Sequence, residues 1–76
     1  MVRIHEKKQR EIKRGKLRVR DDLIFDVEKI ENIYVIKYND KVISKFGGDF
    51  IEACFEYDKY IICASKEDLE GVVNVN

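Results

Sequence analysis

Apolar and polar positions alternate along the middle of this chain in two pairs of runs, each pair separated by a short polar turn. Residues 33–38 and 41–46 are rich in β-branched and aromatic side chains and flank Asn39-Asp40, whereas residues 51–57 and 60–65 flank Asp58-Lys59. Two such runs around a two-residue polar turn are typical of a β-hairpin. The sequence therefore predicts two consecutive hairpins, over residues 33–46 and 51–65.

The pattern of the second hairpin is regular enough to predict its register. With Asp58-Lys59 as the loop, Cys54 lies opposite Cys63, and their spacing allows a cross-strand disulfide. In a reducing compartment we expect two free thiols instead. Because side chains alternate between the faces of a strand, one face is apolar. That face holds Ala53, Phe55, Tyr57, Tyr60, Ile62 and Ala64.

A helix competes with the first strand of this hairpin. Asp49 and Glu52 form the D-x-x-E pattern of a helix N-terminus. Helical spacing is also followed by Phe50, Ala53, Cys54 and Tyr57. Residues 49–58 are therefore open between strand and helix, and we favour the strand.

The remaining segments also indicate short strands between polar breaks. The sequence predicts strands over residues 16–20, 23–27 and 72–75, breaks at residues 21–22, 31–32 and 47–49, and a helical turn over residues 65–68. Short strands at regular spacing are typical of β-sandwiches and barrels. We expect a mainly β fold, namely a small antiparallel meander or barrel-like domain of five to seven short strands.

The N-terminal segment differs from the rest in both pattern and charge. Residues 4–14 allow a short helix that ends at Gly15, so we divide the chain into a basic N-terminal arm, residues 1–15, and a β domain, residues 16–76. The 76-residue chain has a net charge of zero. Residues 1–20, however, carry nine Lys and Arg against two acids, and the rest carries six against thirteen. This asymmetry is the most informative feature of the sequence.

A basic segment of this density predicts non-specific binding of nucleic acid, either DNA or RNA, through phosphate contacts. The first hairpin adds a platform on which tyrosines interleaved with lysines suit base stacking. A purely structural interpretation is that the tyrosines cover the rim of the core, while the lysine stems lie along it and hold their charges in solvent. The predicted nucleic-acid-binding residues are Lys7, Lys8, Arg10, Lys13, Arg14, Lys16, Arg18, Arg20, Tyr34, Tyr38, Lys41 and Lys45.

A second class of function explains the same charge asymmetry. A basic arm and an acidic body favour a self-assembling module, such as a homodimer, or a regulatory protein that docks on a partner protein through its acidic β body. An exposed edge strand at residues 72–75 would reinforce such pairing.

Groups that carry out catalysis are scarce in this sequence. His5 is the only histidine and stands among lysines, where a solvated side chain is the expected role. Glu52 and Glu56 flank Cys54 on one face. Two glutamates at this spacing usually belong to the solvent-exposed face of a strand. We expect no enzymatic activity, no metal and no cofactor. No apolar run is long enough to cross a bilayer, so we expect no membrane association and a cytoplasmic location, in a cell or an infected host cell.

Overall fold

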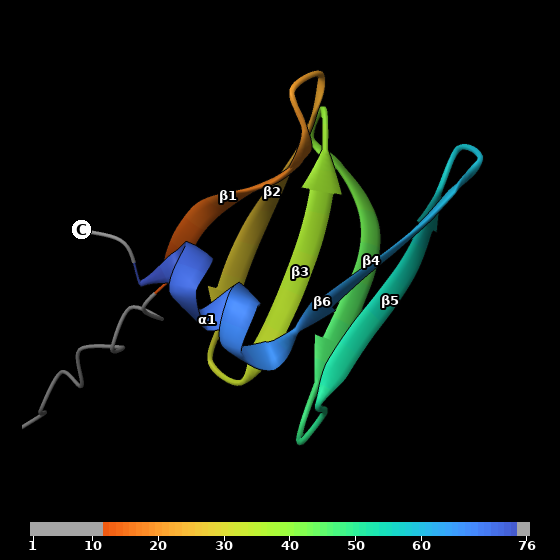
Figure 1. The fold of residues 1–76 in the computed structure, drawn as a ribbon. Coiled ribbons are helices and arrows are strands. Elements are labelled where there is room, and N and C mark those ends of the chain that lie inside the picture. The colour runs from red at the N-terminus through yellow and green to blue at the C-terminus, as the bar shows by residue number, and fades with distance from the viewer. Residues whose placement is uncertain (1–11, 75–76) are drawn as a thin grey trace, which may run out of the picture.

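The structure is a computed structural model and describes residues 12–74. Within this range β1–β4 form one antiparallel sheet in the order β1-β2-β3-β4, and β5 pairs with β6 in a second (Figure 1). The mainly β fold predicted from the sequence is confirmed at this level. The elements are β1 (Ile12–Arg20), β2 (Leu23–Ile30), β3 (Ile33–Tyr38), β4 (Lys41–Gly47), β5 (Glu52–Tyr57), β6 (Tyr60–Ser65) and α1 (Lys66–Val73).

Both hairpins predicted from the alternating pattern are present. Asn39 and Asp40 have φ angles of 51° and 65°, and a type I′ hairpin turn requires positive φ at both central positions. In the β5–β6 hairpin the register is the predicted one, with Cys54 opposite Cys63 and Tyr57 opposite Tyr60. The helix considered for residues 49–58 does not form, because strand alternation buries the apolar side chains there and exposes the polar ones.

The N-terminal helix is not seen in the described residues. Residues 12–14, the end of the expected helix, belong to β1, and the strand continues through Gly15 to Arg20. The rest of the expected arm, residues 1–11, lies outside the described range. Of the nine cations in residues 1–20, five therefore belong to a paired strand.

The prediction of a strand over residues 72–75 is also wrong, because Val72 and Val73 lie in α1. Ser65 begins this helix with a capping box: its side chain accepts from the Asp68 backbone N–H at 3.0 Å, and the Asp68 carboxylate accepts from the Ser65 N–H at 3.4 Å. Leu69 and Val73, one helical turn apart, are both buried. Burial of Leu69 and Val73 stabilises the helix by more than the strand propensity of Val72 and Val73 opposes it.

The β5–β6 hairpin and α1 lie on the same face of the four-stranded sheet, the hairpin on the β4 side and the helix over β1 and β2 (Figure 1). Phe25 is at the centre of the core between the layers. Its ring lies 5.2 Å from that of Phe55 and 5.3 Å from that of Tyr57. The core consists of Leu23, Phe25, Val27, Tyr34, Ile36, Ala53, Phe55, Ile62, Ala64, Leu69 and Val73.

Among residues 12–74, α1 is the one helix, and its eight residues fall short of the length and apolarity needed to cross a bilayer.

Candidate nucleic-acid interface

The face of the β1–β4 sheet opposite the hairpin and helix is called here the outer face. Strand pairing defines its members, because directly opposed residues in antiparallel strands point to the same side. One row across the sheet runs Arg14, Glu28, Val35 and Lys45, and the next runs Lys16, Asp26, Lys37 and Val42. Arg18 follows, opposite Ile24. The strands thus give the outer face five cations and two carboxylates, and Asp40 of the β3–β4 turn adds a third carboxylate at its edge.

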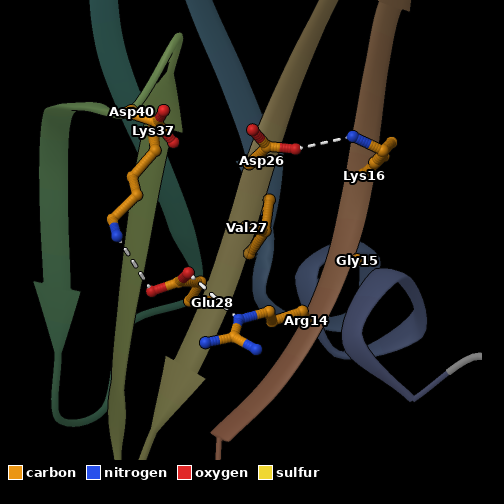
Figure 2. A pocket seen from close by; sticks show the side chains of 8 residues that line it. All are labelled: Arg14, Gly15, Lys16, Asp26, Val27, Glu28, Lys37 and Asp40. Atoms are coloured by element: carbon orange, nitrogen blue, oxygen red, sulfur yellow. Dashed lines mark hydrogen bonds and ion pairs between the residues drawn. The ribbon is translucent and has the colours of Figure 1, made fainter.

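The two strand carboxylates hold three of these cations in ion pairs (Figure 2). Glu28 lies between Arg14 and Lys37, with its two oxygens 3.2 Å from Arg14 Nε and 3.2 Å from Lys37 Nζ. Asp26 Oδ1 lies 2.8 Å from Lys16 Nζ. The Arg14 and Lys16 side chains remain 67% and 72% exposed, so each of their pairs is worth about 1 kcal/mol or less. An incoming anion is therefore able to compete for these cations.

Figure 2 shows these side chains around a hollow in the outer face, with Glu28 between the two cations that it pairs with. The volume of the hollow is about 390 Å³. Six of its eight lining residues are charged. It is lined by Arg14, Gly15, Lys16, Asp26, Val27, Glu28, Lys37 and Asp40.

Arg18 and Lys45 are the other two cations of the outer face, and neither forms an ion pair with any residue from 12 to 74. Both side chains are exposed. Five cations against three carboxylates leave this face with a surplus of two positive charges, which equals the charge that these two residues supply. A row of Ile12, Ile30, Ile33 and Gly47 also lies on this face.

Two of the predicted cations on β1 point away from the outer face. Lys13 lies opposite Lys29, and its Nζ donates to Asn74 Oδ1 at 3.1 Å. The guanidinium of Arg20 lies 4.5 Å from the centre of the Tyr60 ring and pairs with Asp22 at 3.5 Å. The structure therefore separates these two residues from Arg14, Lys16 and Arg18. Lys7, Lys8 and Arg10 lie outside the described residues.

The aromatic platform is not present on the outer face, because its tyrosines point into the molecule. Tyr34 has no exposed surface, and its ring meets that of Phe50 edge-on. Tyr38 is half-buried with its ring 4.8 Å from that of Tyr57, and Lys41 lies opposite Tyr38 on the same inner side. The core-rim interpretation of these tyrosines fits this arrangement.

Burial, followed by the negative charge of Glu70, raises the pKa of the Tyr34 hydroxyl above its ordinary value of 10.0. Glu70 influences this hydroxyl through space, but no hydrogen bond of good geometry connects Tyr34 Oη to any described residue. The residue is thus part of the core and unavailable to a nucleic-acid base.

A bulge in β4 moves Lys45 away from the tyrosines. Tyr38 pairs with Lys41 and Lys37 with Val42, but Ile36 then pairs with Ser44, which leaves Ile43 as an extra residue. The shift of one residue transfers Lys45 to the outer face, opposite Val35. Sequence reasoning also missed Lys37, although alternation with Tyr34, Ile36 and Tyr38 was a signal that it faces the other way.

Charge is divided between the two layers of the molecule. Residues 12–48, which contain β1–β4, carry nine basic and six acidic residues. Residues 49–74, which contain the β5–β6 hairpin and α1, carry two basic and seven acidic residues. The asymmetry in the sequence becomes a basic sheet backed by an acidic hairpin and helix.

Comparison with known proteins does not extend this description, since no family model, curated protein or solved structure matches the chain.

Proposed function

We propose that this protein binds nucleic acid with little sequence preference through the outer face of the β1–β4 sheet, assisted by the basic residues that precede β1. The observation that carries the proposal is the surplus of cations on that face. Cations near a phosphate backbone release its condensed counterions, which favours binding whatever the sequence of bases.

The arrangement of the outer-face cations suits a linear polyanion. Arg14, Lys16 and Arg18 occupy alternate positions along β1 and form a row with a spacing of about 7 Å. Lys37 and Lys45 extend the positive charge across β3 and β4. Arginine guanidinium groups are suited to phosphate oxygens, because they offer two parallel donors.

The lack of aromatic side chains among the described residues of the outer face indicates what kind of binding to expect. Its described aromatic neighbours, Tyr34 and Tyr38, are in or near the core, so base stacking contributes little. Phosphate contacts then supply most of the affinity. Binding of that kind depends strongly on salt and weakly on base sequence.

A titration of labelled 20-nucleotide probes tests the proposal. Fluorescence anisotropy is measured with single-stranded DNA, single-stranded RNA and duplex DNA at several salt concentrations. Three to five phosphate contacts predict a slope of log affinity against log salt of about −2 to −3.5 for a single strand. Absence of binding at low salt, or binding that salt does not weaken, contradicts the proposal.

Two charge-reversal variants localise the interface. Arg18→Glu changes a cation on the outer face without breaking an ion pair among residues 12–74, and Lys59→Glu makes the same change of charge in the β5–β6 turn. We expect Arg18→Glu to weaken binding by about tenfold or more, while Lys59→Glu leaves it within about twofold. Equal losses in both variants would show that overall charge, and not the outer face, controls binding.

The division of charge also favours a second candidate function, self-association between the basic outer face of one copy and the acidic layer of another. Ile61 and Ile51, 72% and 89% exposed, lie in that acidic part of the chain. Light scattering of the unaltered chain and of Arg18→Glu separates the two candidates, because both depend on the outer face. Lost nucleic-acid binding at an unchanged oligomeric mass supports the first, whereas an oligomer that Arg18→Glu dissociates supports the second.

A further inference from the structure

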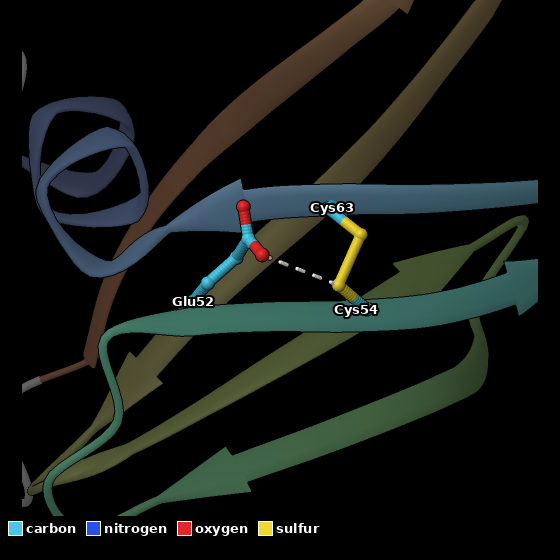
Figure 3. A group of neighbouring side chains, drawn as sticks. All are labelled: Glu52, Cys54 and Cys63. Carbon is cyan, nitrogen blue, oxygen red and sulfur yellow. Dashed lines mark hydrogen bonds between the residues drawn. A yellow bond between two sulfur atoms is a disulfide. The ribbon is translucent and has the colours of Figure 1, made fainter.

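The exposed side of the β5–β6 hairpin brings together two cysteines and a carboxylate (Figure 3). This hairpin does not belong to the β1–β4 sheet that carries the outer face. Cys54 of β5 and Cys63 of β6 are directly opposed, with their Cα atoms 4.1 Å apart, and form a disulfide, the alternative to the free thiols expected in a reducing compartment. Glu52 lies two residues before Cys54 on the same side of the strand. All three side chains are exposed to solvent.

Glu52 is aimed at the sulfur atoms. Its Oε1 lies 3.8 Å from Cys54 Sγ, and Figure 3 shows the carboxylate turned toward the disulfide. This contact is not a hydrogen bond, because a disulfide sulfur carries no hydrogen to donate. One carboxylate oxygen and the two sulfurs all lie within 4.8 Å of one another.

Three donors gathered this closely are able to surround a zinc ion once the two sulfurs are no longer bonded to each other. Zinc binds thiolate sulfur at about 2.3 Å and carboxylate oxygen at about 2.0–2.2 Å in a tetrahedron, so neighbouring ligand atoms are about 3.3–3.8 Å apart. We propose that reduction of the Cys54–Cys63 disulfide creates a binding site for one Zn²⁺ per chain, formed by the two thiolates and the Glu52 carboxylate, with water in the fourth position.

The proposal involves two balanced steps. A phosphine reductant supplies two electrons to the disulfide: the S–S bond breaks, water provides the oxygen of the phosphine oxide, and each sulfur gains a proton. Zinc then binds the two thiols and displaces both protons to solvent, because the thiolate and not the thiol is the ligand. The disulfide form has no thiolate to offer, so oxidation closes the site.

The surroundings of the site favour a cation. The hairpin and α1 belong to the acidic layer, with seven acidic and two basic residues among positions 49–74. The antiparallel pairing of β5 and β6 places the two cysteines directly opposite each other. The apolar side chains on the other face of the hairpin pack in the core, so we expect this pairing to persist after reduction.

Zinc binding is measured by competition with a chromogenic chelator, on the full chain reduced with a phosphine and on the oxidised chain. We expect one Zn²⁺ per reduced chain, two protons released per zinc in weakly buffered solution, and no binding above background by the oxidised chain. Equal binding by both forms overturns the proposal. One zinc per two chains also overturns it, since the metal would then have four cysteine ligands from two copies.

Matched variants test the three ligands. Glu52→Gln removes the proposed oxygen ligand, whereas Glu56→Gln makes the same change two residues beyond Cys54, where the side chain lies opposite Ile61. Loss of an outer partner of a metal ligand costs about 10–100-fold in affinity, and loss of a direct ligand costs at least as much. We expect that loss for Glu52→Gln, Cys54→Ser and Cys63→Ser, and less than about twofold change for Glu56→Gln. Equal effects of the two glutamine variants contradict a role for Glu52.

Circular dichroism of each variant shows whether it folds. Reduced Cys54→Ser that is folded and still binds zinc as tightly as the unaltered chain overturns the assignment of the thiolates.

Discussion

Gly15 of β1 lies directly against the backbone of Val72 in α1, so that a Cβ atom at residue 15 would collide with the Val72 carbonyl oxygen. The helix covers the sheet at the point where the strand has no side chain. This contact holds the C-terminal helix against the first described strand, and it explains a glycine in the middle of a strand, where glycine is otherwise unfavourable.

Gly15→Ala is expected to destabilise the fold by about 2–3 kcal/mol, because the obstructing atom belongs to the backbone and the helix has to shift. Gly71→Ala is the matched control. Its Cβ would meet nothing within 4 Å, and alanine in place of glycine within a helix stabilises by about 1 kcal/mol. Urea unfolding of both variants measures the difference. If the two substitutions change stability in the same direction, the close contact is not what position 15 requires.

Glu28→Gln tests whether the carboxylates of the outer face restrain nucleic-acid binding. Glu28 forms ion pairs with Arg14 and Lys37, each with a nitrogen–oxygen distance of 3.2 Å. Loss of its charge leaves both cations available to phosphate. We expect higher affinity for a single-stranded probe and a salt slope that is steeper by about 0.7 for each added phosphate contact. Glu56→Gln, with the same change of charge on the hairpin, serves as control. Unchanged affinity in Glu28→Gln would argue that phosphates bind elsewhere.

Tyr34→Phe removes a buried hydroxyl that lacks a hydrogen bond among the described residues. An unsatisfied buried polar group is costly, so we expect the variant to be as stable as the original or about 1 kcal/mol more stable. Nucleic-acid affinity should not change, because the ring is inaccessible. Thermal unfolding at neutral pH and the anisotropy titration measure both expectations.

The raised pKa of Tyr34 also predicts how the stability of the fold changes with pH in alkaline solution. The pKa of Tyr34 is raised in the folded state by burial and by Glu70, whereas the unfolded chain titrates near the ordinary 10.0. Above pH 10 the folded state therefore retains a proton that the unfolded state has lost, and stability falls as pH rises through the folded pKa. Tyr34→Phe should decline less steeply between pH 9 and pH 11. A decline as steep as that of the unaltered chain would show that Tyr34 does not contribute; Tyr60→Phe, at an exposed tyrosine, controls for loss of a hydroxyl.

Reduction of the Cys54–Cys63 disulfide should lower the free energy of unfolding while leaving the domain folded. The bond joins residues nine positions apart, and closing a loop of that size is worth about 2.5 kcal/mol in the chain-entropy account. The two sulfurs contribute nothing to the buried core, so the core persists after reduction. Chemical unfolding with and without a phosphine measures the loss, and a Cys54→Ala/Cys63→Ala variant should show no effect of the reductant.

Local alternation predicted the β5–β6 hairpin well, because each of its two strands buries one side and exposes the other. The register of β5 and β6 follows from a regular turn at Asp58 and the strict alternation of Ala53, Phe55 and Tyr57. The β3–β4 register was predicted only as far as Val42, since the bulge at Ile43 has no distinct signal in the sequence. That single inserted residue changed the assigned face of Lys45, and with it the composition of the candidate interface.

Long-range packing decided the two ends of the described chain, which local patterns did not predict. Gly15 was interpreted as a helix stop, but its actual role depends on Val72, which is remote in sequence. The capping box at Ser65 correctly indicated a helix start, whereas the length of the helix depends on the burial of Val73 against the core. The outer face could not be defined from sequence for the same reason, because it is whatever side of the sheet α1 and the hairpin leave uncovered.

The separation of basic and acidic residues into two layers affects how the protein binds to charged surfaces. A chain with no net charge would ordinarily pass through an ion-exchange column near its isoelectric pH. Here opposite signs lie on opposite sides, which gives the protein a large electric dipole moment and lets it rotate to present whichever side a matrix attracts. Both sulfonate and quaternary-amine resins should retain it at low ionic strength, each by a different side.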